Sequence, residues 1–95
     1  MVITILEAHV DADRSSDLEQ DFKQRTNKLP PQMMQTFLLQ DTADKTLWRI
    51  VSVWKSRDAL QEMRSSGETP AGILMFRSAG AEPQLSVFNV PAAAP

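Results

Sequence analysis

The chain has 95 residues, no cysteine, and a formal charge of −2 from 10 basic and 12 acidic side chains. This length allows one domain with a thin hydrophobic core. The balanced charge argues against a nucleic-acid groove or an anionic membrane surface as partner, and the lack of cysteine excludes disulfides, thiolate catalysis and Cys-ligated metal sites.

The chain begins with a predicted strand and a predicted helix. Residues 2–10 (VITILEAHV) are rich in β-branched side chains, and their first half is apolar at both parities, as in a strand covered on both faces. After a polar turn, Ser16 and Glu19 have the spacing of a capping box, so a helix is expected to begin there and to stop at Pro30. The apolar side chains on one face of this helix are Leu18, Phe22 and Leu29.

Two strands joined by a polar connector of hairpin length follow. Residues 33–40 (MMQTFLLQ) and residues 47–54 (LWRIVSVW) have the composition of strands. Side chains alternate between the two faces of a strand, so every second residue of the later segment shares a face. One face is predicted to carry Trp48, Ile50, Ser52 and Trp54, and the other face Leu47, Arg49, Val51 and Val53.

The last elements are a helical region in two pieces and a closing strand. Ser56 is a good N-cap for a helix, which the segment 65–69 (SSGET) interrupts. A further helix is predicted over residues 71–78, and Gly80 is placed to close it. Residues 84–90 (QLSVFNV) alternate between apolar and polar side chains, which predicts a fourth strand.

The element order β-α-β-β-α-β predicts an α+β, ferredoxin-like domain over residues 1–90, in which helices cover one face of a four-stranded antiparallel sheet. Residues 91–95 (PAAAP) are expected to form a disordered tail. The other face of the sheet would expose a large apolar patch. Two such sheets packed face to face would cover it, so we expect a homodimer that forms a dimeric α/β barrel.

Residues 50–60 (IVSVWKSRDAL) form a strand that ends in Trp-Lys-Ser before a helix containing Ala-Leu, and this segment resembles the antibiotic-biosynthesis-monooxygenase (ABM) family. The resemblance extends from the first strand to Val90. It implies the dimeric ferredoxin-like fold. Members of the family oxidise anthrones or quinols with molecular oxygen and no cofactor, degrade bound haem, or have no known reaction.

The haem-degrading members place an Asn near the end of the first strand, a Trp on the second helix and an iron-ligating His slightly further on. The matching positions here are Ala8, Met63 and about Gly72, and none of them carries the required group. The single histidine, His9, lies on the first strand instead. The resemblance therefore argues against haem degradation, and we expect neither a cofactor nor a metal site.

His9 is the candidate catalytic residue. As the one side chain expected to titrate near neutral pH, it could act as a general base that takes a proton from a phenol or a carbon acid and so starts an oxygenation. The alternative, a half-exposed histidine at a strand end with no part in chemistry, stays open.

Five further side chains are candidates for a substrate pocket between sheet and helices. Trp54 and Trp48 offer aromatic walls, although Trp54 also suits an anchor packed under the following helix. Arg49 could hold a carboxylate or enolate oxygen of the substrate, or form an ion pair instead. Met63 and Phe76 supply soft apolar surface, which suits a cavity for a flat ligand and equally a core.

The function predicted from these features is cofactor-independent monooxygenation of a small aromatic or quinol-type molecule. A ligand-binding or regulatory dimer without chemistry is the alternative, because the polar groups available to a site are few. No stretch approaches the roughly 20 apolar residues of a membrane span, and Glu7 interrupts the apolar N-terminal run. We therefore expect a cytoplasmic protein with no membrane or nucleic-acid partner.

Overall fold

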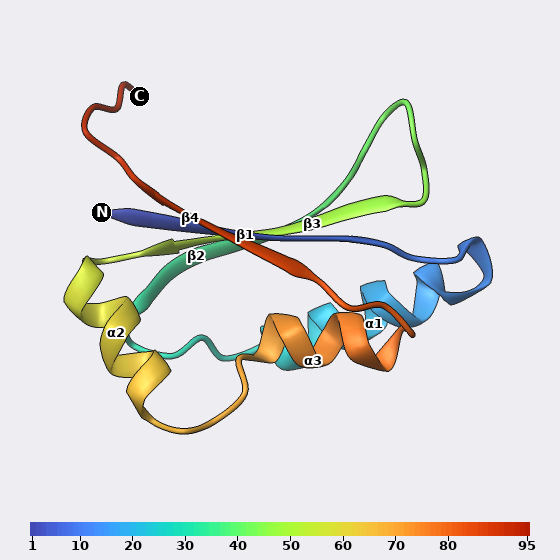
Figure 1. The fold of residues 1–95 in the computed structure, drawn as a ribbon, viewed down its shortest axis with the longest axis horizontal. Coiled ribbons are helices and arrows are strands. Elements are labelled where there is room, and N and C mark those ends of the chain that lie inside the picture. The colour runs from blue at the N-terminus through green and yellow to red at the C-terminus, as the bar shows by residue number, and fades with distance from the viewer.

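The three helices lie on one side of a four-stranded antiparallel sheet in the computed structural model, which describes residues 1–95 (Figure 1). The strands are β1 (Val2–His9), β2 (Met33–Gln40), β3 (Leu47–Trp54) and β4 (Gln84–Asn89). The helices are α1 (Ser15–Arg25), α2 (Arg57–Ser65) and α3 (Ala71–Ser78). The predicted α+β ferredoxin-like fold is confirmed.

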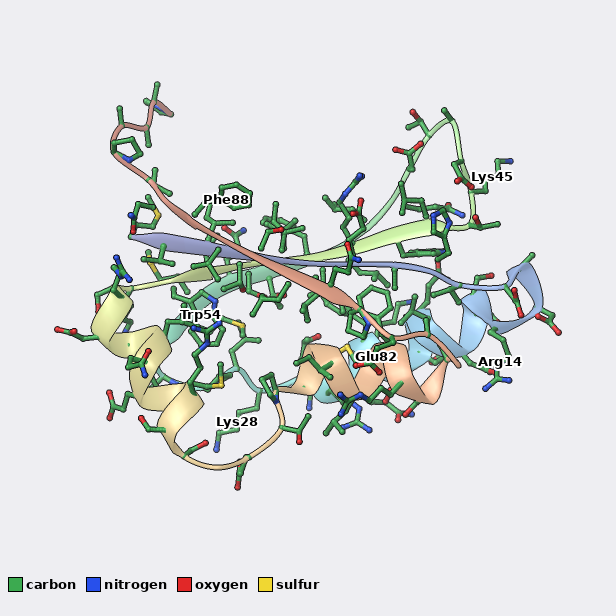
Figure 2. All side chains as sticks on the ribbon, in the orientation of Figure 1. Arg14, Lys28, Lys45, Trp54, Glu82 and Phe88 are labelled. Atoms are coloured by element: carbon green, nitrogen blue, oxygen red, sulfur yellow. The ribbon has the colours of Figure 1, made fainter.

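The strands lie in the order β2-β3-β1-β4, so β1 and β3 form the centre of the sheet. The even-numbered side chains of both central strands are buried, and their odd-numbered side chains are partly or fully exposed. The two faces predicted for β3 are therefore confirmed. Figure 2 shows Trp54 on the helix side of the sheet and Phe88 on the opposite side.

The start of α1 differs from the prediction. A 3-10 turn, Ala12–Arg14, leads directly into the helix, which begins at Ser15 without any side-chain cap. The Ser15 hydroxyl instead donates to the carbonyl of Ala12 at 2.8 Å. The predicted capping box of Ser16 and Glu19 is wrong, because Ser16 already lies inside the helix.

The end of α1 also differs from the prediction. The helix ends at Arg25 and not beside Pro30. At Thr26 both the backbone N–H and the hydroxyl donate to the carbonyl of Phe22, at 3.0 Å and 2.6 Å, and the chain then leaves the helix. Leu29 consequently lies outside α1, in an irregular segment that leads to β2.

The second helical region agrees with the prediction. The Ser56 hydroxyl accepts the backbone N–H of Ala59 at 3.0 Å and caps α2. Gly80 follows α3 with a φ of 80°, a left-handed conformation that glycine adopts without a steric penalty. Residues 91–95 are exposed and extend beyond β4 (Figure 1), and their disorder stays a prediction.

The buried apolar side chains form two separate clusters on the helix side of the sheet. The smaller cluster consists of Val2, Trp54 and Leu60, where α2 packs on the ends of β1 and β3. The larger cluster consists of Leu6, Ala8, Val10, Leu18, Trp48, Ile50, Met75, Phe76 and Ala79. The core is therefore divided along the sheet, beneath the gap between α2 and α3.

The other face of the sheet has no helix over it. Phe37, Leu39 and Phe88 are exposed there to 42%, 45% and 49%.

None of the three helices is long and apolar enough to cross a membrane.

Candidate functional site

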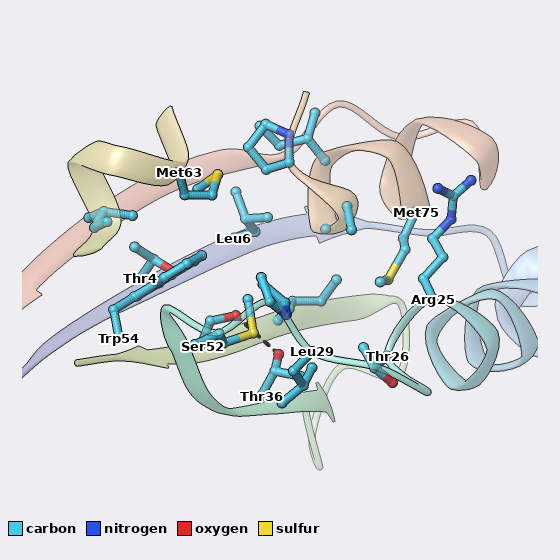
Figure 3. A pocket seen from close by; sticks show the side chains of 18 of the residues that line it. Thr4, Leu6, Arg25, Thr26, Leu29, Thr36, Ser52, Trp54, Met63 and Met75 are labelled. Carbon is cyan, nitrogen blue, oxygen red and sulfur yellow. Dashed lines mark hydrogen bonds between the residues drawn. The ribbon is translucent and has the colours of Figure 1, made fainter. Parts of the chain in front are cut away.

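A cavity of about 130 Å³ lies between the two core clusters, with the sheet as its floor and α2 and α3 as its walls (Figure 3). The irregular segment after α1 contributes Leu29 and Pro30 to the same cavity. Most of its surface is apolar. The apolar side chains of the floor and walls include Leu6, Met33, Ile50, Trp54, Met63 and Met75.

Trp54 forms one end of the cavity. Its indole N–H donates to the hydroxyl of Thr4 at 2.9 Å, and its ring packs against Leu60. Because β3 passes into α2 through the Ser56 cap, the first turns of α2 fold back over Trp54 and bring Met63 to the cavity. The strand-to-helix corner thus builds one wall of the site.

Three hydroxyl groups lie on the floor of the cavity. They belong to Thr4 on β1, Ser52 on β3 and Thr36 on β2. The hydroxyls of Thr36 and Ser52 are hydrogen-bonded to each other at 3.0 Å (Figure 3). A fourth hydroxyl, that of Thr26, also lines the cavity but donates to a backbone carbonyl of α1.

The charged residues of the cavity are all basic. Arg25 and Arg64 line it, and none of the 12 acidic residues of the chain does. Arg25 donates through Nε to the carboxylate of Asp21 at 2.8 Å, so part of its charge is already paired. The lining therefore favours a neutral or anionic ligand over a cationic one.

The structure brings two of the six predicted site residues to the cavity, Trp54 and Met63. Trp48 and Phe76 belong to the larger core cluster, exposed to 3% and 0%, and do not line the cavity. The geometry of one chain therefore does not support their predicted contact with a substrate. Within one chain, both side chains pack in the core.

His9 and Arg49 lie on the opposite face of the sheet from the cavity. His9 has a side chain 68% exposed, with Nδ1 3.1 Å from the hydroxyl of Thr46. Arg49 forms ion pairs with Glu7 and with Asp41. The catalytic role of His9 and the substrate-binding role of Arg49 stay predictions, and neither side chain reaches the cavity within one chain.

The hydroxyls of the floor and the two arginines were not among the residues predicted for the site. One signal was available, because Ser52 shares a strand face with Ile50 and Trp54, and a lone hydroxyl on an apolar face is a candidate polar contact. Arg25 and Arg64 gave no such signal, since basic residues in the last turn of a helix are common.

Comparisons with known proteins agree with this fold. The family model described as antibiotic biosynthesis monooxygenase matches residues 1–72. SnoaB, a cofactor-independent oxygenase from Streptomyces nogalater, is 15% identical with a TM-score of 0.73, and the match covers 99% of this chain and 96% of that chain. The haem degrader MhuD from Mycobacterium tuberculosis, solved with two haems in its active site, is 20% identical with a TM-score of 0.72 and complete coverage of both chains. No curated protein matches the chain.

The cavity residues do not fit a haem of the kind that a histidine ligates. No histidine lines the cavity, and the thioethers of Met33, Met63 and Met75 are the side chains there that could ligate iron. No group of three or more His, Asp or Glu side chains is placed to hold a metal ion. The chemistry available at this site is that of an apolar cavity with hydroxyl and guanidinium donors.

Proposed function

Because the chain belongs to the antibiotic biosynthesis monooxygenase family, we propose that it is a cofactor-independent monooxygenase acting on a small aromatic or quinol-type molecule. The observation that carries this proposal is the cavity itself, which is apolar, lined by hydroxyls and two arginines, and free of carboxylates. An aromatic ring would pack between Trp54 and the methionines.

Such a reaction inserts one oxygen atom of O2 into the substrate. A ring CH2 and O2 give a ring C=O and water, so the substrate supplies both hydrogens and the electrons that reduce the second oxygen atom. The substrate must first lose a proton to become an electron-rich anion. Arg25 and Arg64 would lower the pKa of a bound phenol or carbon acid, because nearby positive charge stabilises the anion. The proton would pass to water at the exposed edge of the cavity, so no side chain of the cavity has to be a strong base.

We also propose that two chains pair through the open face of the sheet. Phe37, Leu39 and Phe88 give this face an apolar surface, and a second copy of the same face would bury it. The ion pairs of Arg49 with Glu7 and Asp41 lie on the same face, so these charges are already neutralised within each chain when two chains meet. Sedimentation velocity tests this: Phe37→Glu is expected to give monomers, and Leu74→Glu, on the outer side of α3, to leave dimers.

The second candidate function is a ligand-binding or regulatory dimer without chemistry. One observation favours it: the ionisable groups of the cavity are arginines alone, and His9 lies on the other face of the sheet. Both candidate functions place the ligand in the same cavity. They differ in whether oxygen is consumed when the ligand is bound.

Oxygen uptake with a panel of hydroquinones and anthrones tests the proposal. We expect oxygen uptake with at least one of them. When the reaction is run with oxygen-18-labelled O2, the product should contain one labelled atom. Ala71→Trp, which places an indole at the exposed edge of the cavity, should abolish uptake. Leu74→Trp on the same helix does not line the cavity and should leave it unchanged. Saturable binding without any uptake would establish the binding function instead.

A further inference from the structure

The three hydroxyls on the cavity floor form a continuous row across the sheet. Ser52 is paired in register with Thr4 on one side and with Thr36 on the other. All three side chains point to the helix side, where the cavity lies (Figure 3). Thr4 and Ser52 are exposed to only 7% and 6%, and they are the two buried polar residues of the chain.

The hydrogen bonds within this row leave two protons without an acceptor. The indole N–H of Trp54 donates to Thr4, and one hydroxyl of the Thr36–Ser52 pair donates to the other. The hydroxyl proton of Thr4, and the hydroxyl proton of whichever partner in the Thr36–Ser52 pair accepts, therefore have no acceptor in the protein. A buried donor without an acceptor is costly, so a ligand oxygen placed over the row would be stabilised there.

Thr4 is the best placed of the three donors. The Trp54 N–H occupies one lone pair of its oxygen, which fixes the hydroxyl against the end of the cavity. A hydroxyl that accepts a hydrogen bond also becomes a stronger donor, because hydrogen bonds in a chain polarise one another. The row therefore presents an oriented donor at the foot of an otherwise apolar space.

The cavity has room for one aromatic ring, and the rest of a larger ligand would extend through its exposed edge. An apolar cavity of about 150 Å³ is known to take one benzene ring, and this cavity is about 130 Å³. We propose that Thr4, Ser52 and Thr36 form an oxygen-binding subsite for a single aromatic ring that carries a hydroxyl or carbonyl group, with Thr4 as the principal donor. This inference rests on the proposed function, since it assumes that the cavity is the ligand site.

Phenol and toluene are the probes that test the subsite, because they differ by a hydroxyl in place of a methyl group. Binding to the full-length protein labelled with nitrogen-15 would be followed through the amide signals of Gly72 and Ile73, which line the cavity. Phenol is expected to bind at least as tightly as toluene. Thr4→Val should weaken phenol binding by about 3- to 10-fold, the effect of one net hydrogen bond, without weakening toluene binding.

Two substitutions serve as controls. Thr4→Ser keeps the hydroxyl and should keep the phenol-to-toluene ratio of the wild type. Thr26→Val removes a hydroxyl that lines the same cavity but is already bonded to a backbone carbonyl, so the ratio should not change. Should Thr4→Val fail to fold, Thr4→Ala, which removes the same hydroxyl, provides a second test with the same expected direction.

The outcomes separate this inference from the proposed function. Binding of both rings with the same ratio in the wild type and in Thr4→Val would overturn the subsite alone. An equal loss in Thr26→Val and Thr4→Val would overturn it as well, because the effect would not then depend on a free donor. If neither phenol nor toluene shifts the amide signals, the cavity is not a ligand site, and the subsite is overturned with it.

Discussion

The hydrogen bond between Trp54 and Thr4 should appear as a coupling between the two residues in the free energy of unfolding. Both side chains are buried, at 4% and 7% exposure, and their Nε1 and Oγ1 atoms are 2.9 Å apart. Trp54→Phe leaves the Thr4 hydroxyl without its donor, and Thr4→Val leaves the indole N–H without its acceptor. Each single substitution thus adds an unsatisfied buried group, at a cost of about 1–3 kcal/mol.

The double variant removes both polar groups together and should therefore cost less than the sum of the two single variants. We expect the difference to be about 1–2 kcal/mol, within the range found for residues in direct contact. Urea unfolding followed by far-ultraviolet circular dichroism measures it without relying on tryptophan fluorescence. All variants must be compared at one protein concentration, because dimerisation would add to the apparent stability.

Trp48 supplies the control for this cycle. Its indole N–H is buried and has no hydrogen-bond partner, and it lies at the opposite end of β3 from Trp54. Trp48→Phe combined with Thr4→Val should be additive within about 0.3–0.5 kcal/mol, as for independent sites. Additivity between Trp54→Phe and Thr4→Val would refute the hydrogen bond, and with it the orientation assigned to the Thr4 hydroxyl.

Three further predictions concern the core, the hairpin between β2 and β3, and the open face of the sheet. Phe76→Ala should lower the free energy of unfolding in urea by about 3–5 kcal/mol, because Phe76 is fully buried. The backbone N–H groups of Asp44 and then Ala43 lower the pKa of Asp41. The ionised carboxylate of Asp41 therefore contributes stability above the usual carboxyl pKa, and this stability is lost as the pH falls through the lowered pKa of the folded state. Asp41→Asn should thus be less stable than the wild type at neutral pH and equally stable in strong acid. His9→Ala should leave oxygen uptake unchanged, because a base must reach the proton it removes, and a large loss of rate would restore His9 as the base.

The sequence was sufficient for the fold because each element carried its own local signal. The alternation along β3 predicted which of its side chains share a face, and Ser56 predicted the start of α2, both as observed. The limits of α1 were not predictable in the same way. The 3-10 turn before Ser15 takes the place of a capping side chain, and Thr26 ends the helix before the prolines can.

The site was harder to predict than the fold, because its position depends on how the helices cover the sheet. β1 is apolar at both parities in its first half, so its sequence does not show which face the helices cover. Had Ile3 and Ile5 faced the helices, His9 would lie on the same face as the cavity. The two tryptophans of β3 have the same parity, and only the gap between α2 and α3 decides that Trp54, and not Trp48, lines the cavity.

Substitutions at two glycines test whether ligands occupy the space between α2 and α3, and they separate an effect on stability from an effect on binding. A Cβ atom on Gly72 would lie 2.7 Å from Cδ1 of Leu6, a flexible side chain that also lines the cavity. Gly72→Ala should push Leu6 into the cavity and weaken phenol binding, while the gain in helix propensity of up to about 1 kcal/mol offsets much of the strain. Gly67 has a φ of 81° and no atom within 4 Å of an added Cβ, so Gly67→Ala should cost about 1–2 kcal/mol of stability and leave phenol binding unchanged. Wild-type affinity for phenol in Gly72→Ala would show that ligands do not occupy the space between α3 and β1.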